Sequence, residues 1–446
     1  MNTVFILHND PILKEAKIIN LLKKGVWLYF FLLIFEGALR KWFLPFLSTP
    51  LLIVRDPVAI ALIFMCWKHN IIKANVYVLV MTLITMISFA ASLVFGHGSL
   101  SVAIFGARIL IIHFPVIFII AKVFDLEDAI KMGKVMLVLT IIMAILIGLQ
   151  FFSPQSAWVN RGIGGDTAGA GFSGADGYMR PPGTFSFTTG NVMFFSMAAC
   201  YIFYFWLAKV KINRILLIAA TVALLAAVPL SISRTLMFSI AVTFIFTIIA
   251  VASRPKLILR MLVFAIFAML ILVVLGNTDF FGTATGAFTN RFEAANRVEG
   301  GMSTTLFDRF FGKMIHAISG SDLPFFGYGL GMGTNAGSAL LTGKANFLIA
   351  ESEWSRLIGE MGFILGVFIL ILRAIFCADI SIKSYKSIKL NNILPWLLLS
   401  FGITVILQGQ WAQPTVLGFS TLIGGLILAA SKKVDSIDNQ EKLNLI

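Results

Sequence analysis

Apolar residues occupy this chain in long blocks that short polar stretches separate. The blocks have roughly the 17 to 25 residues that an α-helix needs to cross the hydrocarbon core of a bilayer. Those at 135–149 and 216–230 are apolar on nearly every face of a helix, whereas barrel strands alternate apolar and polar positions. The pattern therefore predicts an all-α polytopic membrane protein. We expect about twelve transmembrane helices, near residues 25–40, 50–67, 76–95, 102–121, 135–152, 185–208, 215–231, 235–252, 258–276, 349–372, 393–409 and 414–430.

Lysine and arginine residues gather in every second segment between these blocks. Because such residues mark the cytoplasmic loops of membrane proteins, the sequence predicts that both termini lie in the cytoplasm. Residues 25–430 then form a single transmembrane domain between an N-terminal segment, 1–24, and a tail, 431–446. The N-terminal segment has no signal-peptide cleavage pattern, so we expect the first span to act as an uncleaved signal in a bacterial cytoplasmic (inner) membrane.

The composition excludes a water-soluble globular protein. Hydrophobic residues make up 59% of the chain and charged residues only 13%, whereas soluble domains contain about 25% charged residues. The formal net charge of +14 follows the expected topology, so we predict no nucleic-acid partner. The three cysteines lie within or beside predicted spans, where thiols behave as small apolar groups, and they predict neither a disulfide nor a metal site.

Two of the expected non-cytoplasmic loops are long, at residues 153–184 and 277–348. Long ordered loops often carry binding and catalytic residues. Glycines crowd the first loop from 161 to 185, where they would let the backbone approach a ligand closely or leave the loop mobile. The second loop has polar residues at helical spacing from 287 to 318, which predicts one or two short surface helices.

Charged residues within the spans cluster toward the non-cytoplasmic ends. A charge at the bilayer centre costs about 3 kcal/mol, so each of these residues is a candidate for function. Glu353, Arg356 and Glu360 follow one stripe of a helix in steps of three and four, where they can neutralise one another. The other members of this group are Glu36, Arg40, Lys41, Arg55, Asp56, Arg108 and Arg234.

The arginines of the expected outer face suggest a site for an anion. A guanidinium group is permanently charged, and its planar fork matches phosphate oxygens. Asp176 is the one acidic residue within four positions of Arg180 or Arg234. We therefore expect at least one outer-face arginine to bind an anionic substrate.

Several other kinds of site are absent from the sequence. It contains no GxxxxGK[ST] phosphate loop, no HExxH zinc pair and no GxSxG nucleophile elbow. His97, His113 and His316 lack metal-ligand spacing, and each is interpreted as a lone structural or surface histidine. The string GYGLGMG from Gly327 follows no strand of a βαβ unit, so it is not a dinucleotide fingerprint.

Four segments resemble the O-antigen ligase/polymerase family of bacterial membrane glycosyltransferases and related exopolysaccharide polymerases. They are RPPGTFSFTTGNVMFF from Arg180, SISRT from Ser231, FFGYGLGMGTNAG from Phe325 and ESEWSRLIGEMGFILG from Glu351. Together they cover residues 180–366. The first third of the chain resembles the family only in hydropathy and in FEGALRKWFLP from Phe35.

The resemblance implies a helical fold of the GT-C kind that takes undecaprenyl-diphosphate-linked oligosaccharide from the outer membrane leaflet and needs no metal or other cofactor. Fixed cations would stabilise the departing diphosphate while an acceptor hydroxyl attacks the anomeric carbon. Arg180 and Arg234 are the expected catalytic cations. The expected substrate-binding residues are Arg180, Arg234, Arg291, Arg297, Arg356, Tyr328 and Asn335.

Ligases of this family resemble one another in a histidine just before the span that corresponds to 349–372. This sequence has Asn346 in that region, and His316 lies well upstream. The departure favours a polymerase of lipid-linked repeat units, with Glu351 as the acidic catalytic residue and a chain-length regulator protein as a further partner. The alternatives are a ligase that moves glycan to lipid A core or protein, and a solute transporter, although transporters usually carry charges at the membrane midplane.

Overall fold

We describe the protein from a computed structural model that covers residues 11–432 apart from 253, 277, 300–322, 345–347 and 351. Helices make up most of this part of the chain. They are α1 (Pro11–Ala38), α2 (Asp56–Lys68), α3 (Val76–Val94), α4 (Leu100–Arg108), α5 (Phe114–Val123), α6 (Leu126–Phe152), α7 (Thr188–Leu207), α8 (Arg214–Leu230), α9 (Arg234–Val251), α10 (Pro255–Gly276), α11 (Asp279–Glu299), α14 (Asn335–Thr342), α15 (Glu353–Lys389), α16 (Leu394–Gln408) and α17 (Pro414–Ala430).

Eight helical segments of the described residues are long and apolar enough to cross a membrane. They are Lys14–Phe43, Pro50–Lys68, Val76–Val94, Leu100–Val123, Leu126–Phe152, Thr188–Leu207, Arg234–Val251 and Glu353–Lys389. Four shorter apolar helices, Arg214–Leu230, Ile258–Ile271, Leu394–Gln408 and Pro414–Ala430, coincide with the remaining predicted spans. The predicted all-α architecture with candidate membrane-spanning helices is therefore confirmed, whereas the twelve crossings and the GT-C fold stay predictions.

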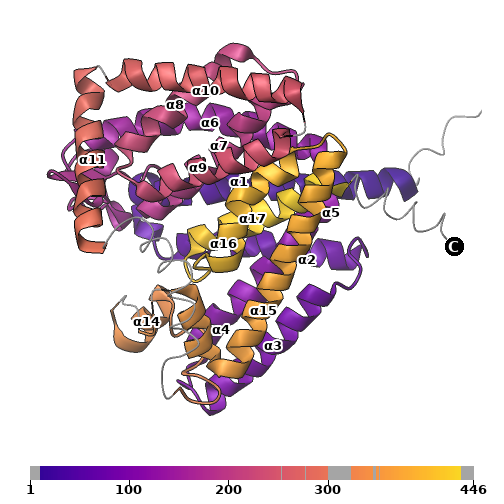
Figure 1. The fold of residues 1–446 in the computed structure, drawn as a ribbon. Coiled ribbons are helices and arrows are strands. Elements are labelled where there is room, and N and C mark those ends of the chain that lie inside the picture. The colour runs from indigo at the N-terminus through magenta and orange to yellow at the C-terminus, as the bar shows by residue number, and fades with distance from the viewer. Residues whose placement is uncertain are drawn as a thin grey trace, which may run out of the picture.

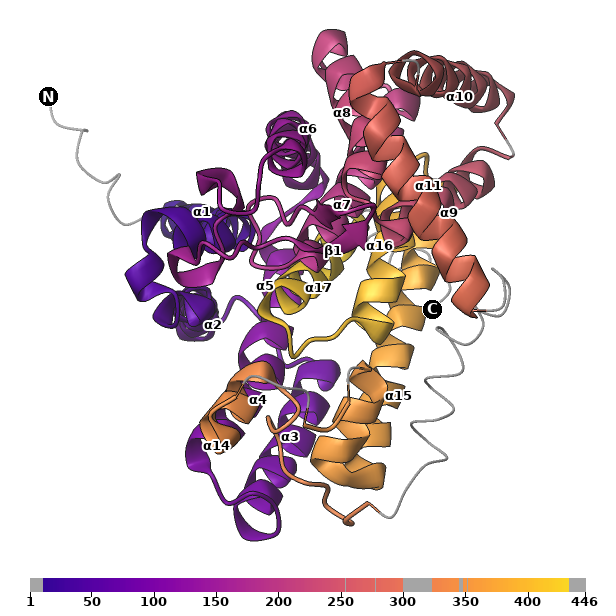
Figure 2. The same ribbon diagram turned by 90° about the vertical axis from the view of Figure 1, so that its left-hand side faces the viewer.

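The central helices of the bundle are α7 and α17, whose side chains are nearly all buried. Helix α17 packs against α5 and α16, and α7 packs against α9 and α16. Figure 1 shows α8 and α10 on one side of this centre, and α3, α4 and α14 on the opposite side. Figure 2 shows the same separation from a second direction.

Helix α15 contains a sharp break at Gly362, which has φ 77° and ψ 167°. A Cβ atom at Gly366 would lie 2.7 Å from the Cα atom of Ile358, so the short part before the break lies against the long part that follows. The long part ends at Lys389, well beyond the boundary predicted at residue 372. The boundary was wrong because the apolar block ends there while the following polar residues continue the helix. The chain leaves the helix near Asn391, which has φ 63°.

The first long loop folds into a β-hairpin, which the sequence analysis did not predict. Strand β1 (Phe172–Ala175) pairs antiparallel with β2 (Tyr178–Arg180), and Phe172 lies opposite Arg180. Asp176 and Gly177 form the turn with φ of 53° and 80°, the left-handed values of a type I′ turn. The later part of the glycine-rich segment is therefore an ordered hairpin.

Helix α11 lies over the hairpin and packs against α8 and β1. The surface helix expected from residue 287 thus begins earlier, at Asp279, and its side chains after Glu293 lie outside the description. Hairpin, α11 and the turn between α8 and α9 all meet at one end of the bundle. We call this end the loop end.

Candidate functional site

Three of the predicted substrate-binding arginines come together at the loop end. Arg180 is the last residue of β2, Arg234 is the first residue of α9, and Arg291 lies in α11. Burial and the positive charges of Arg291 and Arg234 together lower the pKa of Arg180 to about 10. We call these three residues the arginine cluster. Its members come from segments that are far apart in the sequence.

The hairpin places Arg180 in a half-buried position. Its Nε atom is buried and has no hydrogen-bond partner among the described residues. Pro181 and Pro182 follow directly, and both are buried. A buried donor without a partner carries a desolvation cost of about 1–3 kcal/mol, which an incoming acceptor would relieve.

Arg234 emerges from a strained turn. Ile232 precedes it by two residues and has φ 46°, a left-handed value that a β-branched residue rarely adopts. The Ser233 hydroxyl caps α9 by accepting a hydrogen bond from the amide of Leu236 at 3.3 Å. A cation in the first turn of a helix opposes the helix dipole, whereas an anion at that place is favoured by both the dipole and the guanidinium. The anion-binding role predicted for Arg234 is thus compatible with its position at the start of α9 and stays a prediction.

Helix α11 holds the third arginine against the hairpin. The Arg291 Nη1 atom donates hydrogen bonds to the carbonyl oxygens of Gly174 at 2.8 Å and Ser173 at 3.3 Å. Its neighbour Phe292 lies with its ring centroid 6.0 Å from the guanidinium carbon of Arg234. Arg291 therefore ties α11 to β1 and adds a positive charge beside Arg180, while Phe292 contacts the start of α9.

Two residues that the sequence analysis did not select complete this junction. Asn290 donates a hydrogen bond from Nδ2 to the Oδ2 atom of Asp176, at 2.7 Å. The Asp176–Gly177 pair is a strong sequence signal for a β-hairpin, and it could have predicted the ordered turn that Asn290 contacts. The contact between the two loops has no signal in a single sequence.

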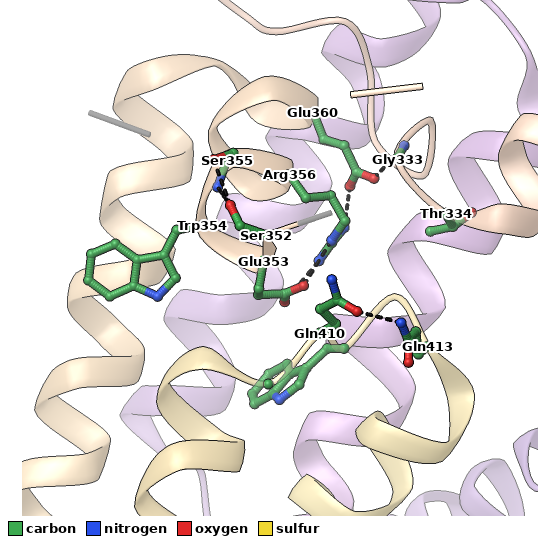
Figure 3. A network of polar contacts seen from close by, with 12 residues as sticks. Gly333, Thr334, Ser352, Glu353, Trp354, Ser355, Arg356, Glu360, Gln410 and Gln413 are labelled. Carbon is green, nitrogen blue, oxygen red and sulfur yellow. Dashed lines mark hydrogen bonds and ion pairs between the residues drawn. The ribbon is translucent and has the colours of Figure 1, made fainter. Parts of the chain in front are cut away.

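Arg356 lies in a different, neutral network. Its guanidinium contacts the carboxylates of Glu353, at 3.0 Å, and Glu360, at 2.6 Å, and Arg373 donates to Glu353 at 2.7 Å. Figure 3 shows Arg356 between the two glutamates, facing the loop that carries Gln410 and Gln413. The mutual neutralisation predicted along this helix stripe is therefore present. Because the Arg356 guanidinium already forms ion pairs with two carboxylates, a structural role is favoured over phosphate binding.

Tyr328 and Asn335 lie beside this network rather than at the arginine cluster. The backbone amide of Tyr328 donates to the Gly359 carbonyl at 2.8 Å, and its side chain is 42% exposed. Asn335 is exposed at the start of α14, which packs on α4. The glycine string around Tyr328 permits close backbone packing, because a Cβ atom at Gly331 would overlap the backbone of α4.

Three further residues of the sequence analysis cannot be placed. Glu351 and His316 lie outside the described residues, and so does the side chain of Arg297 within α11. The catalytic role of Glu351 and the substrate-binding role of Arg297 stay predictions.

A second buried polar network occupies the N-terminal helices. Asp56 accepts hydrogen bonds from Arg108 Nη1 at 2.7 and 2.8 Å, and it lies 2.9 Å from His113 Nε2. The Tyr29 hydroxyl lies 2.9 Å from His113 Nδ1. The prediction that His113 is isolated was therefore wrong, because α1 and α2 bring two polar partners to it. Among the described residues, no group of three or more His, Cys, Asp or Glu side chains could hold a metal ion.

Comparison with known proteins adds no assignment. No family model, curated protein or solved structure matches the chain.

Proposed function

We propose that the chain is a polysaccharide (O-antigen or exopolysaccharide) polymerase that uses undecaprenyl-diphosphate-linked glycan as its donor. The observation that carries the proposal is the convergence of Arg180, Arg234 and Arg291, three residues that the sequence predicts to bind substrate. A lipid diphosphate is an anion at a membrane surface, and three neighbouring guanidinium groups at one end of a helical bundle suit it chemically.

The proposed reaction transfers one glycan to another. A hydroxyl of the acceptor glycan attacks the anomeric carbon of the donor, a new glycosidic C–O bond forms, and the C–O bond to the diphosphate breaks. The acceptor proton passes to a base, for which we propose Glu351, and undecaprenyl diphosphate leaves with the electron pair. The arginine cluster would stabilise the negative charge that grows on the leaving diphosphate.

The proposal includes a location and partners. Basic residues in alternate segments support a bacterial inner membrane protein with both termini in the cytoplasm and the loop end in the periplasm. The partners are then lipid-linked oligosaccharide, membrane lipid and a chain-length regulator protein.

A solute transporter is the second candidate, and one observation favours it. Asp56, Arg108 and His113 form a buried charged network around the π-helical turn Ile109–His113, between α4 and α5. Charges at an interrupted helix are a common feature of transport sites. The arginine cluster has no role in that account.

Deletion of the gene separates the candidates. A polymerase deletion accumulates lipid-linked single repeat units and makes no long polymer. A ligase deletion still makes polymer, which stays on its lipid carrier. If chain length and carrier occupancy are unchanged while uptake of a solute is lost, the chain is a transporter.

A further inference from the structure

The segment that follows Arg180 is held by buried polar side chains from three other helices. Lys41, in the turn that continues α1, is only 1% exposed. Its Nζ atom donates hydrogen bonds to the carbonyl oxygens of Gly183 at 2.7 Å and Phe185 at 2.8 Å. No carboxylate of the described residues forms an ion pair with this amine. Within the described part of the chain, the hydrogen bonds of this buried amine thus go to backbone carbonyl oxygens, and the amine also lies 4.7 Å from the centroid of the Trp42 ring.

Gln150 of α6 binds the same residue from another side. Its Oε1 atom accepts a hydrogen bond from the Gly183 amide at 2.8 Å, and its Nε2 atom donates to the Gly183 carbonyl at 3.1 Å. Asn191 of α7 donates to the Pro181 carbonyl at 3.3 Å. The backbone at Gly183 therefore has both of its polar groups bonded to buried side chains.

Little freedom is left between this bonded backbone and Arg180. Pro181 and Pro182 fix two of the intervening φ angles. Gly183 has φ 63°, and a Cβ atom there would lie 2.7 Å from the Met143 sulfur, so the site accepts only glycine without a shift. The restricted backbone between them couples the position of Arg180 to that of Gly183.

The stability of the fold does not explain why a lysine occupies this buried position. Burial of an amine without a carboxylate partner is costly, and its two hydrogen bonds to backbone carbonyl oxygens offset only part of that cost. We infer that Lys41 and Gln150 form a clamp on Gly183 whose role is to position Arg180 for its anionic ligand. Lys41 is a positioning residue in this account, and the inference rests on the proposed function of Arg180.

The test is a double-mutant cycle on ligand binding. Binding of undecaprenyl diphosphate to the purified full-length protein in detergent is measured for the wild type, Lys41→Met, Arg180→Ala and the double variant. Lys68→Met, which alters an exposed lysine, is the matched control. We expect each single variant to weaken binding by about tenfold or more. This is the effect of losing roughly one charge-assisted hydrogen bond, here the bond between Arg180 and the diphosphate. Because Lys41 acts through Arg180, the double variant should bind no more weakly than Arg180→Ala.

The outcomes distinguish the positioning role of Lys41 from the ligand-binding role of Arg180. If the two effects multiply in the double variant, or if Lys41→Met binds as the wild type does while Arg180→Ala does not, the positioning role is overturned and the proposed function survives. If Arg180→Ala itself binds normally, the proposed function of Arg180 fails and the inference fails with it. Should Lys41→Met not be recovered from the membrane, Gln150→Leu replaces it in the same cycle, because Gln150 binds Gly183 from α6.

Discussion

Glu353 and Arg373 are twenty residues apart in one helix, yet their Oε1 and Nη1 atoms lie 2.7 Å apart. A straight helix would separate them by about 30 Å. They meet because the break at Gly362 folds the first part of α15 back along the second. Arg373 also donates to the carbonyl oxygens of Ile406 and Gly409, so this pair ties α15 to the end of α16.

Arg373→Met should destabilise the protein because it leaves the buried Glu353 with fewer partners. Loss of one member of a buried ion pair costs about 3–5 kcal/mol. We expect a clear fall in the melting temperature in detergent. Arg214→Met, at an exposed arginine, is the control and should melt like the wild type. Equal melting of Arg373→Met and the control would contradict the network's structural role.

Gly362→Ala tests the break itself. The φ of 77° and ψ of 167° lie in a region that is essentially limited to glycine and costs a side chain roughly 1–3 kcal/mol, and the added Cβ atom would also overlap the Phe325 carbonyl oxygen. We expect poor recovery of folded protein by size-exclusion chromatography. Gly276→Ala is the matched control, since a Cβ atom there meets nothing within 4 Å. A normal elution profile for Gly362→Ala would show that α15 can straighten.

Arg180→Ala and Arg234→Ala should each abolish polymer without removing the protein from the membrane. Loss of one fixed donor to developing charge lowers turnover by roughly a hundredfold or more. Polymer length on gels is the readout, at matched protein levels, with Arg214→Ala as the control. Normal polymer in both variants would make these arginines structural.

Glu351→Gln should slow the turnover of lipid-linked substrate while leaving its binding intact, because the amide cannot take the acceptor proton. Single-turnover kinetics measure the first effect and direct binding the second. An unchanged rate would remove Glu351 from the reaction.

Binding of the diphosphate should depend on pH through Arg180. Its pKa of about 10 in the free protein lies below the usual value for arginine because the charged form is disfavoured by burial and by two neighbouring cations. A bound anion favours the charged form, so affinity is full below this pKa and falls as the pH rises through about 10. Arg180→Ala should lose this pH dependence. An identical profile in wild type and variant would assign the titration to another group.

The sequence predicted the helices and their charged stripe better than it predicted the site. Hydropathy blocks locate the spans because a bilayer imposes one length on each of them. The neutral stripe of Glu353, Arg356 and Glu360 follows from helix spacing alone, which is local. The meeting of Arg180 with Arg291 depends on a contact between two loops, and no local pattern encodes it. The role of Arg373 was not predicted for the same reason, since Arg373 contacts Glu353 only because the helix breaks at Gly362.

The central claim is that the arginine cluster holds a lipid diphosphate while glycan is transferred, and reconstituted polymerisation tests it most directly. Purified protein is incubated with undecaprenyl-diphosphate-linked repeat units, and the products are separated by size. We predict a ladder of polymers for the wild type and for Arg214→Ala, and only the starting repeat unit for Arg180→Ala and Arg234→Ala. A ladder of equal length and yield from all four proteins would contradict the claim.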